Sequence, residues 1–281
     1  MDLSKIYSPR PDWAHKGNFG SVLVIAGSKL YSGSAALVGV AAVRAGADLV
    51  TVASVERAAN IAANTLPDLI TYPLRGDYLS AKHFREIMDL ASLRKINSVV
   101  VGCGLGRHSQ TLLAIRKLIT KFSVPMVLDA DALLSISLKP EVVFGKHIIL
   151  TPHAGELAVL LKIGQIGVDF NERMERAKQA ALKYKSIVLL KGHIDIVTDG
   201  QIAVTNNTGS PQMTKGGTGD TLAGILGALL SRGVGLMEAS HVAAYINGKA
   251  GEMAAGEKGE SFVASDMFDY FPKVIGGFYV E

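Results

Sequence analysis

A glycine-rich loop that leads directly into an apolar stretch is the segment of this sequence best suited to chemistry. The loop reads Gly216-Gly217-Thr218-Gly219-Asp220. Without Cβ atoms in the way, several backbone N–H groups can converge there. The first turn of a following helix adds its own free N–H groups and the positive end of its dipole. We therefore predict an anion hole formed by Gly217, Thr218 and Gly219, suited to a phosphoryl group during transfer.

The carboxylate of Asp220 beside this predicted anion hole calls for an explanation, because its negative charge would repel a phosphate. It would have a purpose if it accepted a proton from an attacking hydroxyl or helped to organise a cation. The simpler alternative is that Asp220, or Thr218, caps the helix. The spacing of the loop matches neither a Walker A loop nor the G-x-G-x-x-G loop of dinucleotide-binding folds.

Short apolar runs alternate with helical stretches along the first two thirds of the chain. The runs are almost continuously apolar, which is typical of strands buried on both faces of a parallel sheet. Strands are predicted at residues 22–26, 49–52, 69–72, 98–102, 125–129, 147–150 and 187–190. Between them, Ser80 is a candidate N-cap for a helix to about Ser92, and Ser109 for a helix over 110–122. Asp169 and Glu172 have capping-box spacing before a helix that ends near Tyr184.

The pattern changes after residue 190. Two β-branched runs at 194–198 and 202–205 flank Asp199-Gly200, which predicts a hairpin. Two apolar helices are predicted beyond it, at 219–231 and 237–255. The whole pattern predicts an α/β fold with a mostly parallel central sheet, helices on both faces and antiparallel strands near the C-terminal edge. Because no linker or repeat interrupts it, we expect one domain over residues 1–281.

Polar or glycine-containing segments follow several of the predicted strands. In open α/β sheets, ligands bind at the carboxyl ends of the strands, so these segments can meet at one edge of the sheet. They are residues 27–34, 102–106, 129–133, 151–156 and 191–193. Together with the predicted anion hole, they indicate a composite ligand site.

Composition argues against several other classes of function. The net charge is only +4, and the basic residues are scattered rather than interleaved with aromatic ones, so we expect no nucleic-acid partner. The longest apolar runs, about nine residues, are far shorter than the ~20 that a membrane span needs. The N-terminus lacks the apolar core of a signal peptide. We therefore expect a cytoplasmic protein, with its single cysteine, Cys103, as a small residue at a strand end.

Taken together, the motifs resemble those of the ADP/ATP-dependent NAD(P)H-hydrate dehydratases, a family of the ribokinase-like superfamily. The similarity runs in order along nearly the whole chain. The segments that carry it are His15-Lys16-Gly17-Asn18-Phe19-Gly20, Gly104-Leu105-Gly106, Asp129-Ala130-Asp131-Ala132-Leu133, Leu150-Thr151-Pro152-His153 with Gly155-Glu156, Leu190-Lys191-Gly192 and Gly216 to Asp220. The glycine–aspartate motif indicates the superfamily, whereas the His-Lys-Gly opening and Thr-Pro-His-x-Gly-Glu indicate the dehydratase branch.

The resemblance implies a three-layer α/β/α sandwich and a repair reaction on hydrated NADH or NADPH. The hydroxyl on the reduced nicotinamide ring would be phosphorylated from ADP or ATP with Mg²⁺, and elimination of phosphate would restore the ring. Asp220 would be the catalytic residue that activates the hydroxyl. The choice between ADP and ATP stays open, with ADP favoured, and so does the choice between NADHX and NADPHX.

The resemblance also implies roles for individual residues. Ser34, Gly104, His153 and Asp220 would contact the hydrated dinucleotide, while Gly217, Thr218 and Gly219 would hold the phosphoryl group. The adenine nucleotide would bind at Lys191, Gly192, His193, Ile194, Asp195 and Gly219, and Glu156 would organise Mg²⁺ through water. The chain departs from the family at Ser34, where alanine is common, and at Cys103, where proline is common.

Relatives in this family form tetramers, so we expect a homo-oligomer, and we expect no fused epimerase domain. Two alternatives stay open. One is a small vitamin-precursor kinase of the same superfamily, which would share the glycine–aspartate motif. The other is a nucleotide-binding module without catalysis, which would not need the carboxylate of Asp220.

Overall fold

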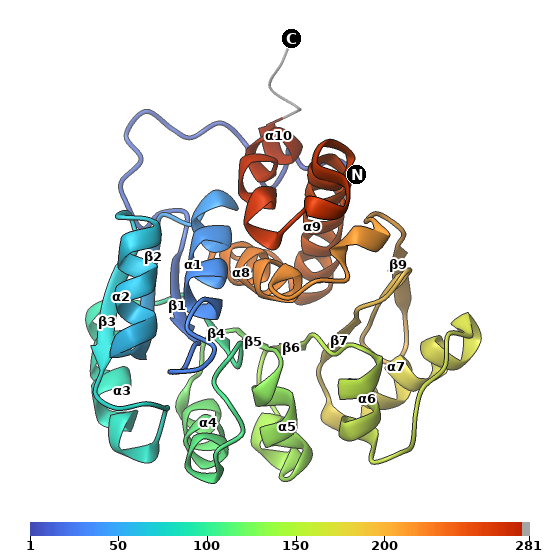
Figure 1. Cartoon of the computed structure of the whole chain (residues 1–281), viewed down its shortest axis with the longest axis horizontal. Helices are drawn as coiled ribbons and strands as arrows, with labels where there is room; N and C mark the ends of the chain where they lie inside the picture. The colour runs from blue at the N-terminus through green and yellow to red at the C-terminus, as the bar shows by residue number, and fades with distance from the viewer. Residues whose placement is uncertain (277–281) are drawn as a thin grey trace.

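The computed structural model describes residues 1–276 and shows one nine-stranded sheet between two layers of helices (Figure 1). The final residues of the expected 1–281 domain lie outside the described part. The strand order is β3-β2-β1-β4-β5-β6-β7-β8-β9. The strands are β1 (Ser21–Ile25), β2 (Leu49–Val55), β3 (Ile70–Leu74), β4 (Ser98–Val101), β5 (Met126–Leu128), β6 (Ile148–Leu150), β7 (Ile187–Leu190), β8 (Asp195–Thr198) and β9 (Ala203–Asn206).

The pairing of the strands confirms the predicted mixed sheet. Neighbours are parallel from β3 across to β7, and β7, β8 and β9 pair antiparallel through the predicted hairpin. Every strand predicted from the apolar runs is present. The largest difference is in β2, which continues to Val55 rather than ending at 52.

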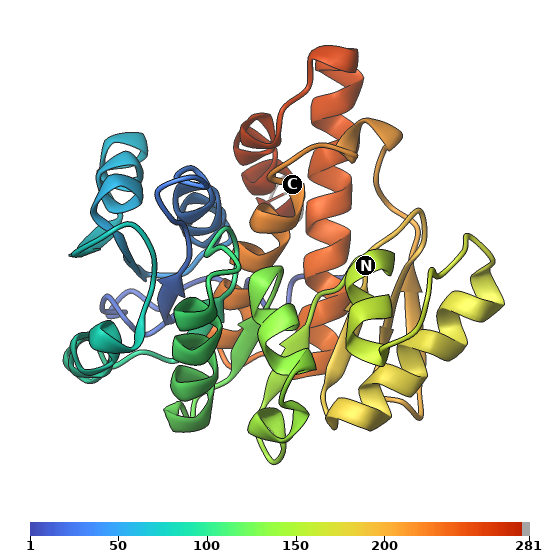
Figure 2. The same ribbon diagram turned by 60° about the horizontal axis from the view of Figure 1, so that its bottom comes forward.

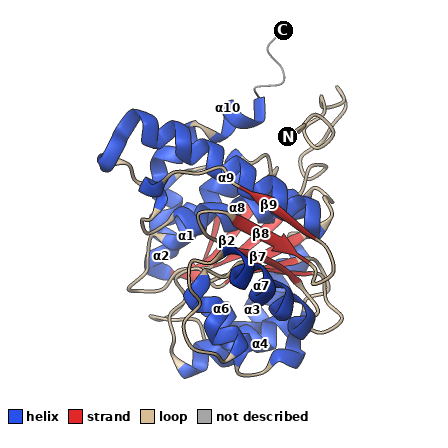
Figure 3. Ribbon diagram, turned by 90° about the vertical axis from the view of Figure 1, so that its right-hand side faces the viewer, coloured by secondary structure: helices blue, strands red, loops and turns tan. Residues whose placement is uncertain are grey.

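Helices cover both faces of the sheet, as Figures 1 and 3 show. One layer contains α1 (Ser34–Arg44), α2 (Glu56–Thr65), α8 (Thr218–Ser231), α9 (Leu236–Lys258) and α10 (Phe271–Gly276). The other contains α3 (Phe84–Leu93), α4 (Ser109–Lys121), α5 (Asp131–Ser137), α6 (Ala154–Leu161) and α7 (Phe170–Tyr184). Figure 2 shows α9, in orange-red, as the long helix beside the sheet. Within residues 1–276, no helix combines the length and apolar character that crossing a bilayer requires.

Two of the predicted helix starts are corrected. The cap of α4 is His108 rather than Ser109, because the His108 ring nitrogen accepts from the Gln110 N–H at 3.2 Å. Ser80 caps a short 3₁₀ turn, Ala81–His83, that precedes α3. The Asp169 cap of α7 is confirmed by a 2.8 Å bond from the Glu172 N–H.

Alternation along the central strands divides the core into two halves. In β1, Val22 and Val24 pack into the core under α1, α8 and α9, whereas Leu23 and Ile25 pack into the core on the opposite face. The first half also needs close packing of α1 on α8. A Cβ atom on Gly224 would lie 2.3 Å from the carbonyl oxygen of Val38. The glycine therefore lets the middle of α8 approach the backbone of α1 closely.

The chain reverses its direction across the sheet at β1. From β1 it proceeds to β2 and β3 on one side, and it then returns to place β4 on the other side. The loops that leave the carboxyl ends of β1 and β4 therefore diverge. In open α/β sheets, this divergence creates a crevice that binds ligands.

Candidate active site

A cleft of about 700 Å³ opens at the point where the strand order reverses. Residues 28–31, from the loop after β1, form one wall, and residues 104–108, from the loop after β4, form another. Two residues with predicted substrate contacts, Ser34 and Gly104, line this cleft. The sequence predicted a site at the carboxyl edge of the sheet but did not show which two strands would enclose it.

Gly104 brings the two walls together. Its φ of +62° lies in the left-handed region, and a Cβ atom there would lie 2.5 Å from Ser34 Oγ and 2.8 Å from Tyr31 Cβ. Any larger residue would therefore push the loop after β4 away from the start of α1. Tyr78 and His108 stack at 4.1 Å on the cleft wall and provide an aromatic surface that the sequence motifs did not reveal.

The predicted anion hole is the N-terminal end of α8. Its cap residue, Gly217, has a φ of +103°, and a Cβ atom there would lie 2.7 Å from Leu37 Cδ1. The Thr218 hydroxyl points backwards to the carbonyl oxygens of Met213 and Lys215, at 2.9 and 3.1 Å, and its one proton is directed to these rather than to the helix. No side chain caps this helix, so the alternative of a capping role for Asp220 or Thr218 is wrong. The first-turn N–H groups are left for a ligand.

The Asp220 carboxyl group lies in the first turn of α8, next to Ser34 from α1. Burial raises its pKa from 3.8 to about 7, and the negative charge of Asp129 contributes to the increase. Hydrogen bonds from the Ser34 hydroxyl and the Cys103 thiol oppose the increase. A carboxyl group with a pKa near neutrality can both release and accept a proton under physiological conditions.

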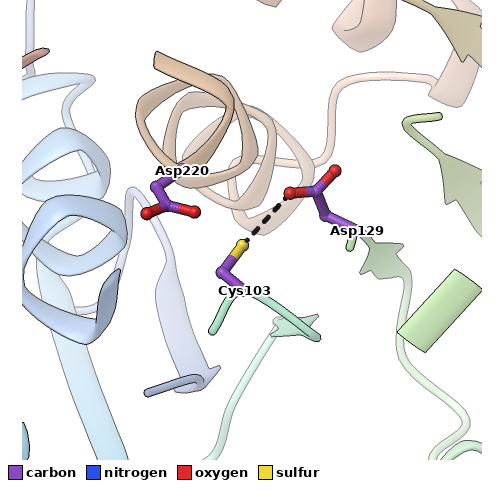
Figure 4. A group of neighbouring side chains, drawn as sticks. All are labelled: Cys103, Asp129 and Asp220. Carbon is purple, nitrogen blue, oxygen red and sulfur yellow. Dashed lines mark hydrogen bonds between the residues drawn. The ribbon is translucent and has the colours of Figure 1, made fainter. Parts of the chain in front are cut away.

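Asp129, next to Asp220, accepts hydrogen bonds from three side chains. It follows β5 directly and is 3% exposed. Its carboxylate accepts from the Thr151 hydroxyl at 2.7 Å, from Lys191 Nζ at 2.8 Å and from the Cys103 thiol at 3.4 Å. Figure 4 shows the thiol between the two carboxyl groups, Asp129 on one side and Asp220 on the other.

The Lys191 side chain points into this cluster rather than to solvent. Its Nζ lies 2.8 Å from Asp129 and 3.8 Å from Glu156 Oε2. Although burial alone would lower the pKa of Lys191, these two carboxylates raise it above its usual value. A Cβ atom on Gly219 would lie 3.4 Å from Nζ. The ammonium group is therefore next to the predicted anion hole, where it adds positive charge.

His153 and Glu156 form the capped start of α6. The His153 N–H donates to Glu156 Oε2 at 2.9 Å, and the His153 ring accepts from the Gly155 and Glu156 N–H groups. The His153 side chain is 60% exposed, whereas that of Glu156 is 20% exposed. Burial is the main cause that raises the pKa of the Glu156 carboxyl group.

The predicted nucleotide segment forms the turn between β7 and β8. The Gly192 N–H donates to Asp195 Oδ1 at 2.9 Å, and the Asn206 amide donates to Asp195 Oδ2 at 3.1 Å. Ile194 is half-buried in this turn, and His193 is exposed. Arg173 of α7 donates to the Lys191 carbonyl at 2.8 Å. The motifs did not reveal Arg173, which brings a second positive charge to this turn.

Two sets of side chains present ligand atoms for a cation, the cluster of Cys103, Asp129 and Asp220 and the carboxyl group of Glu156. Atoms of Cys103, Asp129 and Asp220 lie within 4.8 Å of one another. However, burial raises the pKa of the Cys103 thiol well above its usual value, which disfavours the thiolate form that metals bind. Glu156 suits Mg²⁺ better, because Mg²⁺ keeps most of its water and uses one or two carboxylates with substrate phosphates.

The structure thus gathers the predicted residues into two neighbouring groups. Ser34 and Gly104 line the cleft, and Asp220 lies next to Ser34 without being part of the cleft wall. Lys191, Glu156 and Gly219 meet around the end of β7 and the start of α8, and Asp129 joins the two groups. His153 is on the exposed rim of the second group and is not part of the cleft wall.

Comparisons with known proteins identify the family. The family model described as NAD(P)H-hydrate dehydratase matches residues 22–273. A bifunctional NAD(P)H-hydrate repair enzyme, Nnr, from Methanothermobacter thermautotrophicus is 41% identical over 99% of this chain and 54% of its own length. An ADP-dependent (S)-NAD(P)H-hydrate dehydratase from Cenarchaeum symbiosum is 33% identical over 99% of this chain and 96% of its own length. The chain spans about half the length of the first of these relatives.

Solved structures show the same architecture. The ADP/ATP-dependent NAD(P)H-hydrate dehydratase from Bacillus subtilis, co-crystallised with ATP/Mg²⁺, superposes with a TM-score of 0.79. It is 26% identical, and the match covers 96% of this chain and 94% of that one. The expected ribokinase-like fold is confirmed. On both the sequence and the structural comparisons, the chain belongs to the NAD(P)H-hydrate dehydratase family.

Proposed function

We propose that this protein restores hydrated NADH and NADPH by phosphorylating the ring hydroxyl from ADP or ATP and then eliminating phosphate. The observation that carries the proposal is the position of Asp220. Its carboxyl group lies in the first turn of α8, at the anion hole, and it is hydrogen-bonded to Ser34, which lines the substrate cleft. The pKa of this carboxyl group is about 7. ADP is favoured as the donor, because the relative from Cenarchaeum symbiosum, which matches over nearly its full length, is described as ADP-dependent.

In the first step, Asp220 accepts the proton of the ring hydroxyl while the hydroxyl oxygen attacks the terminal phosphorus of the nucleotide. The bond to the leaving phosphate of the nucleotide breaks, which gives AMP from ADP or ADP from ATP. In the second step, the carbon–oxygen bond breaks and phosphate leaves with the electron pair. The neighbouring ring carbon loses a proton, and the double bond is restored. Phosphate is a far better leaving group than hydroxide.

The residues next to Asp220 suit the transfer of a phosphoryl group. Backbone N–H groups of Gly217, Thr218 and Gly219 are free to bind the phosphoryl oxygens, because no side chain caps α8. Lys191 adds an ammonium group beside Gly219. Donors fixed in this way stabilise charge that develops in the transition state without having to reorganise.

We place the nucleotide and its cation beside this group as part of the proposal. The turn formed by residues 191–195 is the proposed site of the adenine nucleotide, together with Gly219. Glu156 is the proposed ligand of Mg²⁺ through water, and His153 is the proposed contact to the dinucleotide from the rim. When bound, Mg²⁺ would neutralise part of the phosphate charge.

We also propose a cytoplasmic homotetramer. This proposal follows from the family resemblance, and Trp13, which is 87% exposed and not part of the cleft wall, is a large apolar side chain that a further copy would cover. Light scattering during size-exclusion chromatography tests this proposal. A monomer at micromolar concentration would contradict it.

The direct test is the return of reduced-nicotinamide absorbance from hydrated NADH, with Mg²⁺ and either ADP or ATP. We expect recovery with at least one nucleotide, and a large loss of rate for Asp220→Asn. No recovery with either nucleotide would refute the proposal. A stable phosphorylated product without recovery would indicate a kinase instead, and recovery without nucleotide would exclude phosphoryl transfer.

A further inference from the structure

The thiol of Cys103 lies between two carboxyl groups, that of the proposed base Asp220 and that of Asp129. Cys103 lies two residues after the end of β4 and is fully buried. Its sulfur donates to Asp129 Oδ2 at 3.4 Å, and it also lies within 4.8 Å of an oxygen of Asp220. Figure 4 shows that the two carboxyl groups approach the sulfur from different sides. A thiol has one proton, so it can donate to only one of them at a time.

The backbone around Cys103 is fixed. Its carbonyl oxygen accepts from the Gly27 N–H at 2.8 Å. The preceding residue, Gly102, has a φ of +129°, and a Cβ atom there would lie 1.8 Å from the Asp129 carbonyl oxygen. The thiol is thus held against the segment that contains Asp129. The change open to it is a rotation of its S–H bond from one carboxyl group to the other.

The surroundings keep the thiol protonated. Burial raises its pKa well above the usual value, and the charge of Asp129 adds to the effect. Cys103 is therefore a donor and does not compete with Asp220 as a base. When the thiol turns away from Oδ2, Asp129 keeps its two donors on Oδ1, the Thr151 hydroxyl and the Lys191 ammonium group, and the charge of Lys191 still compensates its own.

The groups that act on the Asp220 carboxyl come from four elements around it. They are Ser34 from α1, Cys103 from the loop after β4, Asp129 from the end of β5 and Lys191 from the end of β7. Of these, Asp129 opposes ionisation of Asp220, and the other three favour it. The thiol donates to Asp129 at 3.4 Å and lies within 4.8 Å of an oxygen of Asp220, so a rotation of its S–H bond can change which carboxyl group it faces.

We propose that Cys103 is a positioning residue that bridges the two carboxyl groups, donating to Asp129 while Asp220 is protonated and turning to Asp220 when it ionises. The bridge would stabilise the base form of Asp220 before the ring hydroxyl is attacked. The catalytic consequence rests on the function proposed above for Asp220. The turn of the thiol itself is a property of the free protein.

Infrared spectroscopy can follow this turn, because the chain contains one cysteine and therefore one S–H stretching band. We expect the band to shift as the pH rises through about 7, and to stay constant in Asp220→Asn. A band that does not change with pH in the unsubstituted protein would overturn the bridge. A shift on adding Mg²⁺ alone would also overturn it, in favour of a metal bound by the three groups.

Kinetics provide the second readout. Cys103→Ala removes the donor that stabilises ionised Asp220, so it should lower kcat/KM roughly three- to tenfold at pH values below the midpoint of the pH profile. Well above the midpoint Asp220 is ionised with or without the thiol, so kcat/KM should change little there. Cys103→Ser retains a donor and should restore most of the loss. An equal loss at every pH, or no rescue by serine, would indicate a packing role and refute the bridge. If hydrated NADH is not a substrate, the infrared result still decides the question.

Discussion

Replacing Asp220 by asparagine should stabilise the protein at neutral and alkaline pH while it removes the proposed base. The substitution is nearly isosteric and leaves an oxygen to accept from Ser34 and Cys103. It removes a negative charge that burial and Asp129 disfavour. Active sites often retain such unfavourable groups because function requires them.

The sign and size follow from the pKa of Asp220. Because the native value is raised, the contribution of the neutral carboxyl to stability is fully present below about pH 3.8 and is lost as the pH rises to about 7. At about 1.4 kcal/mol per pKa unit, burying Asp220 lowers the free energy of unfolding by about 1.7 kcal/mol at pH 5 and by about 4 kcal/mol at pH 8, relative to a carboxyl group that stays neutral. Asp220→Asn should therefore raise the free energy of unfolding by about 2.5 kcal/mol more at pH 8 than at pH 5. If water reaches the site and screens the charge, the difference should be about half as large.

Urea unfolding of both proteins at the two pH values measures this difference. The comparison cancels the titration of every other group that the substitution does not affect. Asp68→Asn is the matched control, because Asp68 is exposed and its replacement should give the same small effect at both pH values. An equal gain from Asp220→Asn at pH 5 and pH 8, or a loss at pH 8, would refute the reasoning.

Three further predictions concern the same site. Gly104→Ala should raise KM for the hydrated dinucleotide at least tenfold, since its Cβ would lie 2.5 Å from Ser34 Oγ, whereas Gly164→Ala, which meets no atom within 4 Å, should leave KM unchanged. Lys191→Met should lower kcat by roughly 10²-fold and also lower Tm, because it removes charge beside the anion hole and leaves Asp129 without its counter-ion. The pH profile of kcat/KM should fall below about pH 7, because protonation removes the base form of Asp220; a flat profile between pH 5 and 8 would contradict that role.

Most of the fold could be predicted because its signals are local. Strands buried on both faces are nearly continuous apolar runs, so β1 to β7 can be found from the sequence. The hairpin of β8 and β9 was signalled by Asp199-Gly200. The start of α4 was misplaced by one position because serine is the more usual cap, while here the His108 ring nitrogen accepts the bond.

The site was only partly accessible from the sequence. The glycine–aspartate motif indicated Asp220 and the anion hole because both lie in one short segment. The roles of Cys103, Asp129 and Lys191 depend on three different strands, β4, β5 and β7, ending at the same edge of the sheet, and no spacing along the chain shows this. Cys103 was therefore interpreted as a small residue at a strand end, although its thiol contacts Asp129 directly.

The central claim is that phosphate leaves with the oxygen of the ring hydroxyl. Hydrated NADH with a heavy-oxygen label in that hydroxyl, incubated with the protein, Mg²⁺ and ADP or ATP, tests this claim in one measurement. Phosphoryl transfer followed by elimination predicts one labelled inorganic phosphate for each NADH restored, detected by mass spectrometry. Restored NADH with the label in water and unlabelled phosphate would contradict the account.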